Sequence, residues 1–193
     1  IVFLSHNESV QANKILAIPE TVITERLILS RLRMEDAEEI FYTYASKPES
    51  TKFVSWPTHQ AIKDTREFLC RTKSGWYEGI DYSFSIRLKK TGRFIGGCGF
   101  MNDAGKVQIG YVLGPLHWGK GYATEAAKKL LEILKDEAGV YRIGSFIDAE
   151  NTASAKVLLK AGLVEEACLH NWFRFPNQGN VPKDCILFKI PEG

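Results

Sequence analysis

The sequence predicts a single domain of the mixed α/β class (α+β), with a central sheet of about seven strands flanked by helices. Strand-like and helix-like segments follow one another in the order β-α-α-β-β-β-α-β-α-β-β. The chain has 193 residues, 45% of them hydrophobic, which suffices for one buried core but is short for two domains. We therefore divide it into an N-terminal extension, residues 1–20, which we leave unassigned, and one domain, residues 21–193.

The first part of the domain is predicted to contain one strand and two helices. Residues 24–33 alternate charged and apolar side chains, as a strand with one buried face does. Residues 34–45 and 61–77 carry apolar side chains compatible with helices, namely Ala37, Ile40, Phe41 and Tyr44 in the first and Ile62, Phe68, Leu69 and Trp76 in the second. Residues 53–59, between these helices, are expected to form a loop.

The middle of the chain is predicted to form strands over residues 82–88, 93–101 and 107–113. Residues 90–92 join the first two of these strands, and residues 102–105 turn the chain into the third. Gly114 and Pro115 then close the third strand, because both residues interrupt regular pairing.

The last part of the domain alternates helices and strands. A helix is predicted from Tyr122 onward, because apolar residues recur at helical spacing at Ala123, Ala126, Ala127, Leu130, Leu131 and Leu134. A shorter helix has Asn151 or Thr152 as its N-terminal cap and ends at Gly162. The sheet is completed by strands over residues 141–148, 164–174 and 185–190.

The junction before Tyr122 is the most distinctive part of the sequence, reading Trp-Gly-Lys-Gly-Tyr-Ala-Thr-Glu-Ala-Ala over residues 118–127. The first N–H groups of a helix have no partner within it and carry a partial positive charge, and glycines let an anion approach them closely. The turn is therefore a candidate pyrophosphate site. Gly119 and Gly121 are equally compatible with a role in turning the chain alone.

The same residues come close to the nucleotide-binding P-loop pattern. Gly114 to Gly121 spell Gly-x-x-x-x-Gly-Lys-Gly, but a P-loop has Ser or Thr after the lysine, whose hydroxyl binds Mg²⁺. Gly121 has no side chain for that role. The pattern therefore disfavours a P-loop nucleotidase.

The turn resembles the acyl-CoA turn of the GNAT acetyltransferases, (Arg or Gln)-x-x-Gly-x-(Gly or Ala), with Gly121 to Ala123 at its last three positions. Trp118 stands at the Arg/Gln position, which is typical of the ribosomal-protein-alanine N-acetyltransferases (the RimJ/RimL-like branch). Residues 150–163 resemble a second element of that family, Asn-x-x-Ser on a helix ending in Lys-x-Gly-Phe, with Leu163 in place of Phe. Residues 24–33 are similar to its opening strand, Thr-x-Arg-Leu-x-Leu-Arg.

This resemblance implies acetyl transfer from acetyl-CoA to an amine, without a metal. In that family the pantetheine arm lies along the strand before the glycine turn and the pyrophosphate lies at the turn. The implied cofactor-binding residues are Tyr111, Val112, Leu113, Trp118, Gly119, Lys120, Gly121, Tyr122, Ala123, Thr124 and Asn151. Because no cysteine lies near either motif to carry an acyl group, we expect direct attack in a ternary complex.

The resemblance also points to Ser154 as the acid that protonates the departing thiolate, because the ribosomal-protein branch has a Ser at this position. The alternative is that its hydroxyl only bonds the backbone in the first turn of its helix. Gln108 stands where several GNAT enzymes carry a Glu base, and an amide cannot accept a proton at neutral pH. A site without a strong base suits an α-amine of pKa about 7.7–8.0 better than a lysine of pKa about 10.4.

The acceptor amine is therefore expected to be a protein N-terminus of the ribosomal-protein type, with polyamines, amine-bearing antibiotics and metabolites as alternatives. A catalytically silent acyl-CoA-binding protein is a further alternative, with Gln108 marking lost chemistry. An acceptor groove could be walled by aromatic and neighbouring residues, namely Trp56, Pro57, His59, Trp76 and Tyr77, which are equally compatible with the core.

Composition narrows the remaining classes. The net charge of +2, from 25 basic and 23 acidic side chains, provides no broad surface for nucleic acid. The cysteines and histidines are scattered without the spacing of a zinc site or a disulfide framework. No apolar run approaches ~18 residues, so we expect no membrane span, a cytoplasmic location, and a monomer or homodimer.

Overall fold

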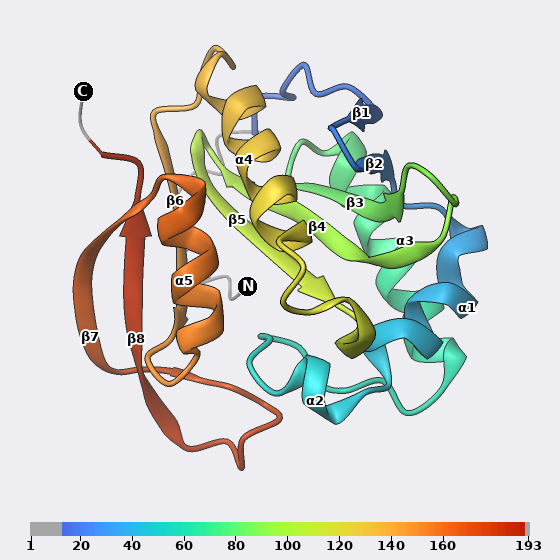
Figure 1. The fold of residues 1–193 in the computed structure, drawn as a ribbon. Helices are drawn as coiled ribbons and strands as arrows, with labels where there is room; N and C mark the ends of the chain where they lie inside the picture. The colour runs from blue at the N-terminus through green and yellow to red at the C-terminus, as the bar shows by residue number, and fades with distance from the viewer. Residues whose placement is uncertain (1–12, 192–193) are drawn as a thin grey trace.

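The computed structural model describes residues 13–191. Within these residues, eight strands form one mixed sheet in the order β1-β2-β3-β4-β5-β6-β8-β7 (Figure 1). All neighbouring strands are antiparallel except the parallel pair β5 and β6. The strands are β1 Thr21–Ile23, β2 Leu27–Arg31, β3 Asp81–Leu88, β4 Phe94–Asp103, β5 Lys106–Leu113, β6 Arg142–Asp148, β7 Val164–Arg174 and β8 Pro182–Lys189.

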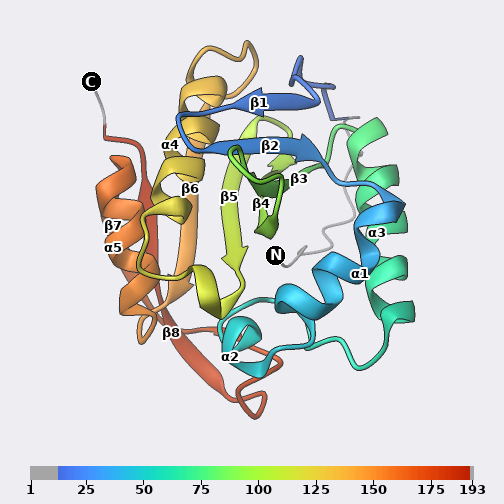
Figure 2. The ribbon, with the colours of Figure 1, turned by 45° about the vertical axis from the view of Figure 1, so that its right-hand side comes forward.

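Helices cover both faces of this sheet. Figure 2 shows α1 and α3 on one side and α4 and α5 on the other. The helical segments are η1 Met34–Asp36, α1 Ala37–Ile40, η2 Phe41–Ala45, α2 Pro48–Thr51, α3 Ile62–Tyr77, η3 Pro115–His117, α4 Tyr122–Lys135 and α5 Thr152–Ala161. No helix among residues 13–191 has the length and apolar character needed to cross a membrane.

The main core packs the apolar face of α4 against the strands, as the spacing of apolar residues predicts, and it also includes Leu158 of α5 and Trp76 of α3. Its α4 members are all buried, namely Ala126, Ala127, Leu130, Leu131 and Leu134. A smaller cluster joins α1, η2 and α3 to Phe94 on β4 and includes Ile40, Tyr44 and Leu69. These clusters fix both helical layers on the sheet.

Part of the N-terminal extension packs on the domain. Leu16 and Ile18 are buried in the main core, and the Leu16 N–H donates a 2.8 Å hydrogen bond to the Tyr82 hydroxyl. The Lys14 ammonium donates to the carbonyl of Ala138, just after α4. Residues 1–12 of the extension lie outside the described residues.

The strand predicted over residues 24–33 is wrong in extent, because the chain reverses direction within it. Thr24 donates its N–H to the Leu27 carbonyl and accepts the Leu27 N–H on its hydroxyl, each at 2.9 Å. This turn separates β2 from the additional strand β1, which raises the number of strands from about seven to eight within the described residues.

Other elements also differ from the sequence prediction. The helix expected over residues 34–45 is a succession of a 3-10 turn, one α turn and a π turn closed by the Ser46 N–H on the Phe41 carbonyl. Helix α2 precedes the predicted loop and has Pro48 in its first turn. Proline is tolerated there because a backbone N–H in the first turn has no partner within the helix. Strand β4 extends through Asp103, and β8 begins at Pro182, because pairing with the neighbouring strand continues beyond the apolar runs.

Candidate functional site

The parallel pair β5 and β6 separates partway along the sheet. Their register covers only residues 106–108 opposite 142–144. Beyond this point β5 stays with β4 up to Leu113, whereas β6 continues with β8. Ser145 on β6 lies where the strands part, and its hydroxyl donates a 2.9 Å hydrogen bond to the Ile109 carbonyl. The two strands therefore border a gap toward their carboxyl ends.

Alternate residues of β5 present backbone groups to this gap. The Gly114 N–H donates a 3.0 Å hydrogen bond to the Ile95 carbonyl on β4. The backbone groups of Gly114, and of Val112 two residues earlier, therefore face β4. Tyr111 and Leu113 therefore turn their N–H and C=O groups toward the gap, where no described strand pairs with them. Of the three predicted arm contacts on β5, two thus have the required backbone orientation and Val112 does not.

The turn before α4 holds two glycines in the left-handed region, with φ of +73° at Gly119 and +79° at Gly121. Residues with a side chain rarely adopt this conformation. A Cβ at Gly119 would meet no described atom within 4 Å, so the space beside the turn is open. Gly121 caps α4, and its carbonyl accepts the first helical hydrogen bond, from Glu125 at 3.0 Å. The helix therefore has no internal acceptor for the amides of Tyr122, Ala123 and Thr124.

The side chains of the turn fold back on the chain. The Trp118 indole donates a 2.9 Å hydrogen bond to the Leu113 carbonyl, and 48% of the residue is exposed. The Lys120 ammonium donates to the Leu116 carbonyl at 2.8 Å. The turn thus offers mainly backbone N–H groups to a ligand, at the positive end of the α4 dipole.

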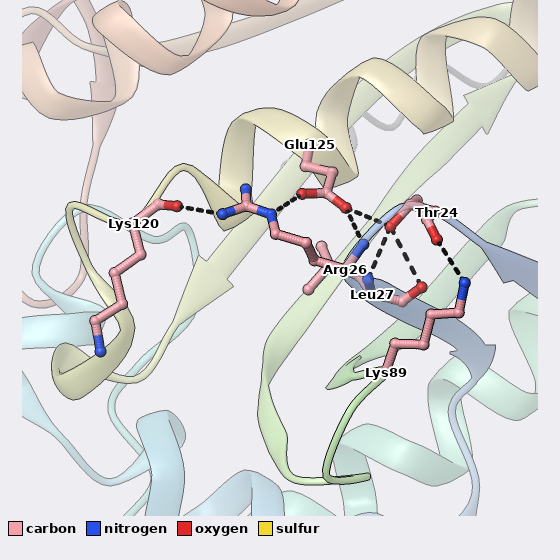
Figure 3. A network of polar contacts seen from close by, with 6 residues as sticks. All are labelled: Thr24, Arg26, Leu27, Lys89, Lys120 and Glu125. Carbon is pink, nitrogen blue, oxygen red and sulfur yellow. Dashed lines mark hydrogen bonds and ion pairs between the residues drawn. The ribbon is translucent and has the colours of Figure 1, made fainter.

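A polar network behind the turn was not predicted as part of the site. Figure 3 shows the Arg26 guanidinium between the Glu125 carboxylate and the Lys120 carbonyl. Thr24 also donates to Glu125, at 2.6 Å. The Thr-x-Arg-Leu pattern of residues 24–27 was the available signal, but a sequence pattern does not reveal a contact with residue 125.

The strand before the glycine turn contacts the second predicted motif. The Tyr111 hydroxyl on β5 donates a 3.1 Å hydrogen bond to the Ser154 carbonyl on α5, and the Ser154 N–H donates to the Asn151 side-chain oxygen, also at 3.1 Å. Asn151 is therefore the N-cap of α5, as predicted. Burial raises the pKa of Tyr111 to about 12, although the Ser154 side chain acts in the opposite direction. Tyr111 is therefore a neutral hydroxyl at physiological pH.

The face of β5 opposite the Tyr111 side chain has open space near Gln108. Side chains alternate along a strand, so Gln108 shares a face with Val112, which packs against the cluster containing Tyr44. Between them, a Cβ at Gly110 would meet no described atom within 4 Å. This face offers room beside the gap and, at Gln108, an amide rather than a carboxylate.

An open groove of about 860 Å³ lies at the carboxyl ends of the separated strands, lined by Pro48, Glu49, Lys52, Pro57, Thr58, Gln60, Asn177 and Gln178. Ser50 on α2 donates to the Leu113 carbonyl at the end of β5, and Gln178 donates to Asp148 at the end of β6. Both walls of the groove are therefore fixed to the strands that border the gap.

Asn177 holds the two walls of the groove together. Its amide nitrogen donates to the carbonyls of Thr51 (2.7 Å) and Trp56 (2.9 Å), and its oxygen accepts from the Thr58 N–H (2.9 Å) and hydroxyl (3.1 Å). The sequence provided no signal for this residue, because its partners lie more than a hundred positions away.

Of the five residues predicted to wall an acceptor groove, Pro57 is the one that lines the groove described above. Trp56 and His59 lie together, with ring centroids 5.0 Å apart, and His59 bonds Thr65 at 2.8 Å. Trp76 is instead buried in the main core. The Tyr77 ring lies beneath the guanidinium of Arg31 on β2. Both residues are at the far end of α3, whose 16 residues span about 24 Å, so they do not line the groove.

Comparisons with known proteins agree with this geometry. The chain is 35% identical over 156 residues to the uncharacterized N-acetyltransferase p20 of Bacillus licheniformis, covering 79% of this chain and 87% of that protein. A GNAT-family acetyltransferase structure from Bacillus anthracis superposes with a TM-score of 0.77 at 25% identity, covering 88% and 97% of the two chains. Mycobacterium smegmatis RimJ, solved in complex with CoA-disulfide, shares the fold at 22% identity and a TM-score of 0.75, covering 85% and 81%.

The sequence also matches the family model described as the acetyltransferase (GNAT) domain over residues 26–164, which is most of the chain. This match contains the glycine turn, both strands of the gap and the Asn151 cap. The protein therefore belongs to the GNAT acetyltransferase family and is an acetyl-CoA-dependent acetyltransferase.

Proposed function

We propose that the protein transfers the acetyl group of acetyl-CoA to the α-amine of a protein N-terminus, by direct attack in a ternary complex. The observation that carries this proposal is the gap between β5 and β6, where the N–H and C=O of Tyr111 and the N–H of Leu113 have no strand partner among the described residues. The Leu113 carbonyl accepts instead from the Trp118 indole and the Ser50 hydroxyl. An extended arm with its own amides and carbonyls pairs with such an edge as an added strand does. The open amides at the start of α4 lie beyond the end of β5, and free amides at a helix N-terminus favour the binding of a diphosphate.

The residues of the turn fit this ligand. The space beside Gly119 is open and can receive phosphate oxygens, and the folded-back Lys120 and Trp118 keep the amides accessible. We assign the diphosphate to the backbone of residues 119–124 and the arm to Tyr111 and Leu113, with Asn151 on the opposite side. Mycobacterium smegmatis RimJ, which shares the fold, was solved in complex with CoA-disulfide, and this supports a CoA-type ligand.

Ser154 is the proposed acid. The neutral amine nitrogen bonds to the acetyl carbon, the carbon–sulfur bond breaks, and the Ser154 hydroxyl donates its proton to the departing sulfur. The nitrogen loses one proton to water, and water returns one proton to Ser154, so the products are the amide and the CoA thiol. Its backbone is fixed at both ends, by Asn151 on its N–H and by Tyr111 on its carbonyl, so the hydroxyl is held in a defined position. Such positioning is a large part of what lowers the barrier in group transfer.

Two features favour an N-terminal acceptor. Gln108 cannot remove a proton from an ammonium, and an α-amine with pKa about 7.7–8.0 is about a tenth to a fifth neutral at pH 7 without help. The groove beside Asn177 has one carboxylate, Glu49, and one ammonium, Lys52, so its charges balance. A balanced groove is a poorer match for a polyamine than for a peptide.

The test is a thiol-release assay with acetyl-CoA and two acceptor sets, peptides beginning with Ala or Ser and a series of polyamines. We expect release with the peptides and a loss of turnover in Ser154→Ala, while CoA affinity in calorimetry stays unchanged. Thr152→Ala is the matched control, because it removes an exposed hydroxyl from the same helical turn. Turnover of polyamines alone would overturn the acceptor assignment. CoA binding without release from any amine would identify a non-catalytic acyl-CoA-binding protein.

A further inference from the structure

Thr24 and Arg26 lie in the turn between β1 and β2, far from the glycine turn in sequence, yet their polar groups converge on its first helical residues. One oxygen of the Glu125 carboxylate accepts from the Thr24 hydroxyl (2.6 Å) and the Arg26 N–H (2.8 Å). The other oxygen accepts from the Arg26 Nε, at 2.6 Å. The carboxylate is thus held by three donors from one turn (Figure 3).

The same guanidinium contacts the glycine turn on both sides of Gly121. The Arg26 Nη1 donates to the Lys120 carbonyl at 3.0 Å. The Arg26 Cζ lies 4.8 Å from the centre of the Tyr122 ring. A Cβ at Gly121 would come within 3.4 Å of Nη2. Arg26 therefore lies beside Gly121, and it bonds Lys120, the residue before Gly121, and Glu125 in the first turn of α4.

The network also compensates the negative charge of Glu125 at the start of α4. Glu125 is in the first turn of α4, where a carboxylate would repel an anion at the helix N-terminus. Burial acts to raise the pKa of Glu125, but the hydrogen bonds from Thr24 and Arg26 outweigh it and lower the pKa, so the carboxylate stays charged. Arg26 supplies the compensating charge, with 44% of its side chain still exposed to solvent.

We propose that Arg26 is a positioning residue for the cofactor: it holds the backbone of the glycine turn in the diphosphate-binding conformation and neutralises Glu125 beside it. This inference rests on the proposed placement of the diphosphate at residues 119–124. It assigns a role to the Thr-x-Arg-Leu pattern, in which Thr24 orients Glu125 and Arg26 connects Glu125 to the turn.

The test compares Arg26→Lys with Arg31→Lys. Arg31, on β2, has a similar ion pair, 2.7 Å from Glu20, and a similar ring contact, 4.9 Å from Trp76, but neither partner belongs to the glycine turn. Lysine keeps the charge but cannot bond Glu125 and Lys120 together. We expect Arg26→Lys to weaken CoA binding in calorimetry about fivefold, and Arg31→Lys to leave it within about twofold.

A second ligand separates a cofactor role from general destabilisation. Pantetheine has no diphosphate, so Arg26→Lys is expected to bind it as the wild type does, in ligand-observed NMR. An equal loss for both ligands, or no loss for CoA, would overturn the role of Arg26 while leaving the proposed function standing. A wild-type protein that binds pantetheine as tightly as CoA would instead overturn the diphosphate placement, and the inference with it.

Discussion

The Tyr111 hydroxyl on β5 donates a 3.1 Å hydrogen bond to the Ser154 carbonyl on α5. This bond connects the strand that borders the gap to the helix that carries the proposed acid. Since Asn151 holds the N–H of the same Ser154, the residue is fixed from two elements. The position of the Ser154 hydroxyl therefore depends on Tyr111 as well as on its own helix.

Tyr111→Phe tests this dependence. The ring keeps its packing, and loss of the hydrogen bond is expected to cost about 0.5–1.5 kcal/mol of unfolding free energy. Turnover is expected to fall about tenfold, because a small displacement of a catalytic group is costly. CoA affinity should be nearly unchanged, because the Tyr111 backbone remains in place. Steady-state kinetics with chemical denaturation separates these effects, and unchanged turnover would show that the hydroxyl does not position Ser154.

Gly121→Ala tests the conformation of the turn. An alanine at a φ of +79° is expected to cost about 1–2 kcal/mol of stability or to shift the turn. Either result weakens CoA binding, because the amides of α4 lose their arrangement. Gly92→Ala, between β3 and β4, is the control: it adds the same methyl group at a φ of +70°, where no described atom lies within 4 Å. Equal CoA affinities in the two variants would contradict the assignment of the turn.

His59 predicts a pH dependence of stability. Burial lowers the pKa of His59 below its ordinary value of 6.5, with Asp64 acting in the opposite direction. Folding therefore favours the neutral ring, so its contribution is complete above pH 6.5 and is lost as the pH falls through the lower, folded-state pKa. The difference in melting temperature between wild type and His59→Gln should narrow on acidification. A constant difference across that range would contradict the prediction.

Asn177→Ala tests the link between the groove walls. Removal of its hydrogen bonds to Thr51, Trp56 and Thr58 should cost about 1–3 kcal/mol and raise the acceptor KM more than the KM for acetyl-CoA. Arg174→Ala is the matched control, since it removes a hydrogen bond to Asn180 within the same β7–β8 loop. Parallel changes in both KM values would mean that the groove does not receive the acceptor.

The sequence predicted local features well. The helix from Tyr122, its buried stripe and the cap at Asn151 follow from residue spacing and capping preferences that act over a few positions. The strand boundary was predicted less accurately at Thr24. There the Thr24 hydroxyl and N–H both bond the backbone of Leu27, and the chain reverses within an alternating pattern.

Long-range contacts were beyond the sequence pattern. Arg26 and Glu125 are 99 positions apart, and Asn177 and Thr58 are 119 apart, so neither pair produces a local signal. Trp76 looked like a candidate for the groove wall because it is aromatic, and only the direction and length of α3 place it in the core. The glycine turn, the helix after it and the Asn151 cap were thus predictable from local motifs, whereas the groove around Asn177 depends on tertiary contacts.

The central claim is acetyl transfer to an N-terminal amine at this site. The most direct measurement is tandem mass spectrometry of a peptide that begins with Ala and contains an internal Lys, after incubation with the protein and acetyl-CoA. We expect acetylation on the α-amine, none on the lysine, and a strong reduction with Ser154→Ala. Acetylation of the lysine alone, or none on this peptide while a polyamine in the same mixture is acetylated, would contradict the account.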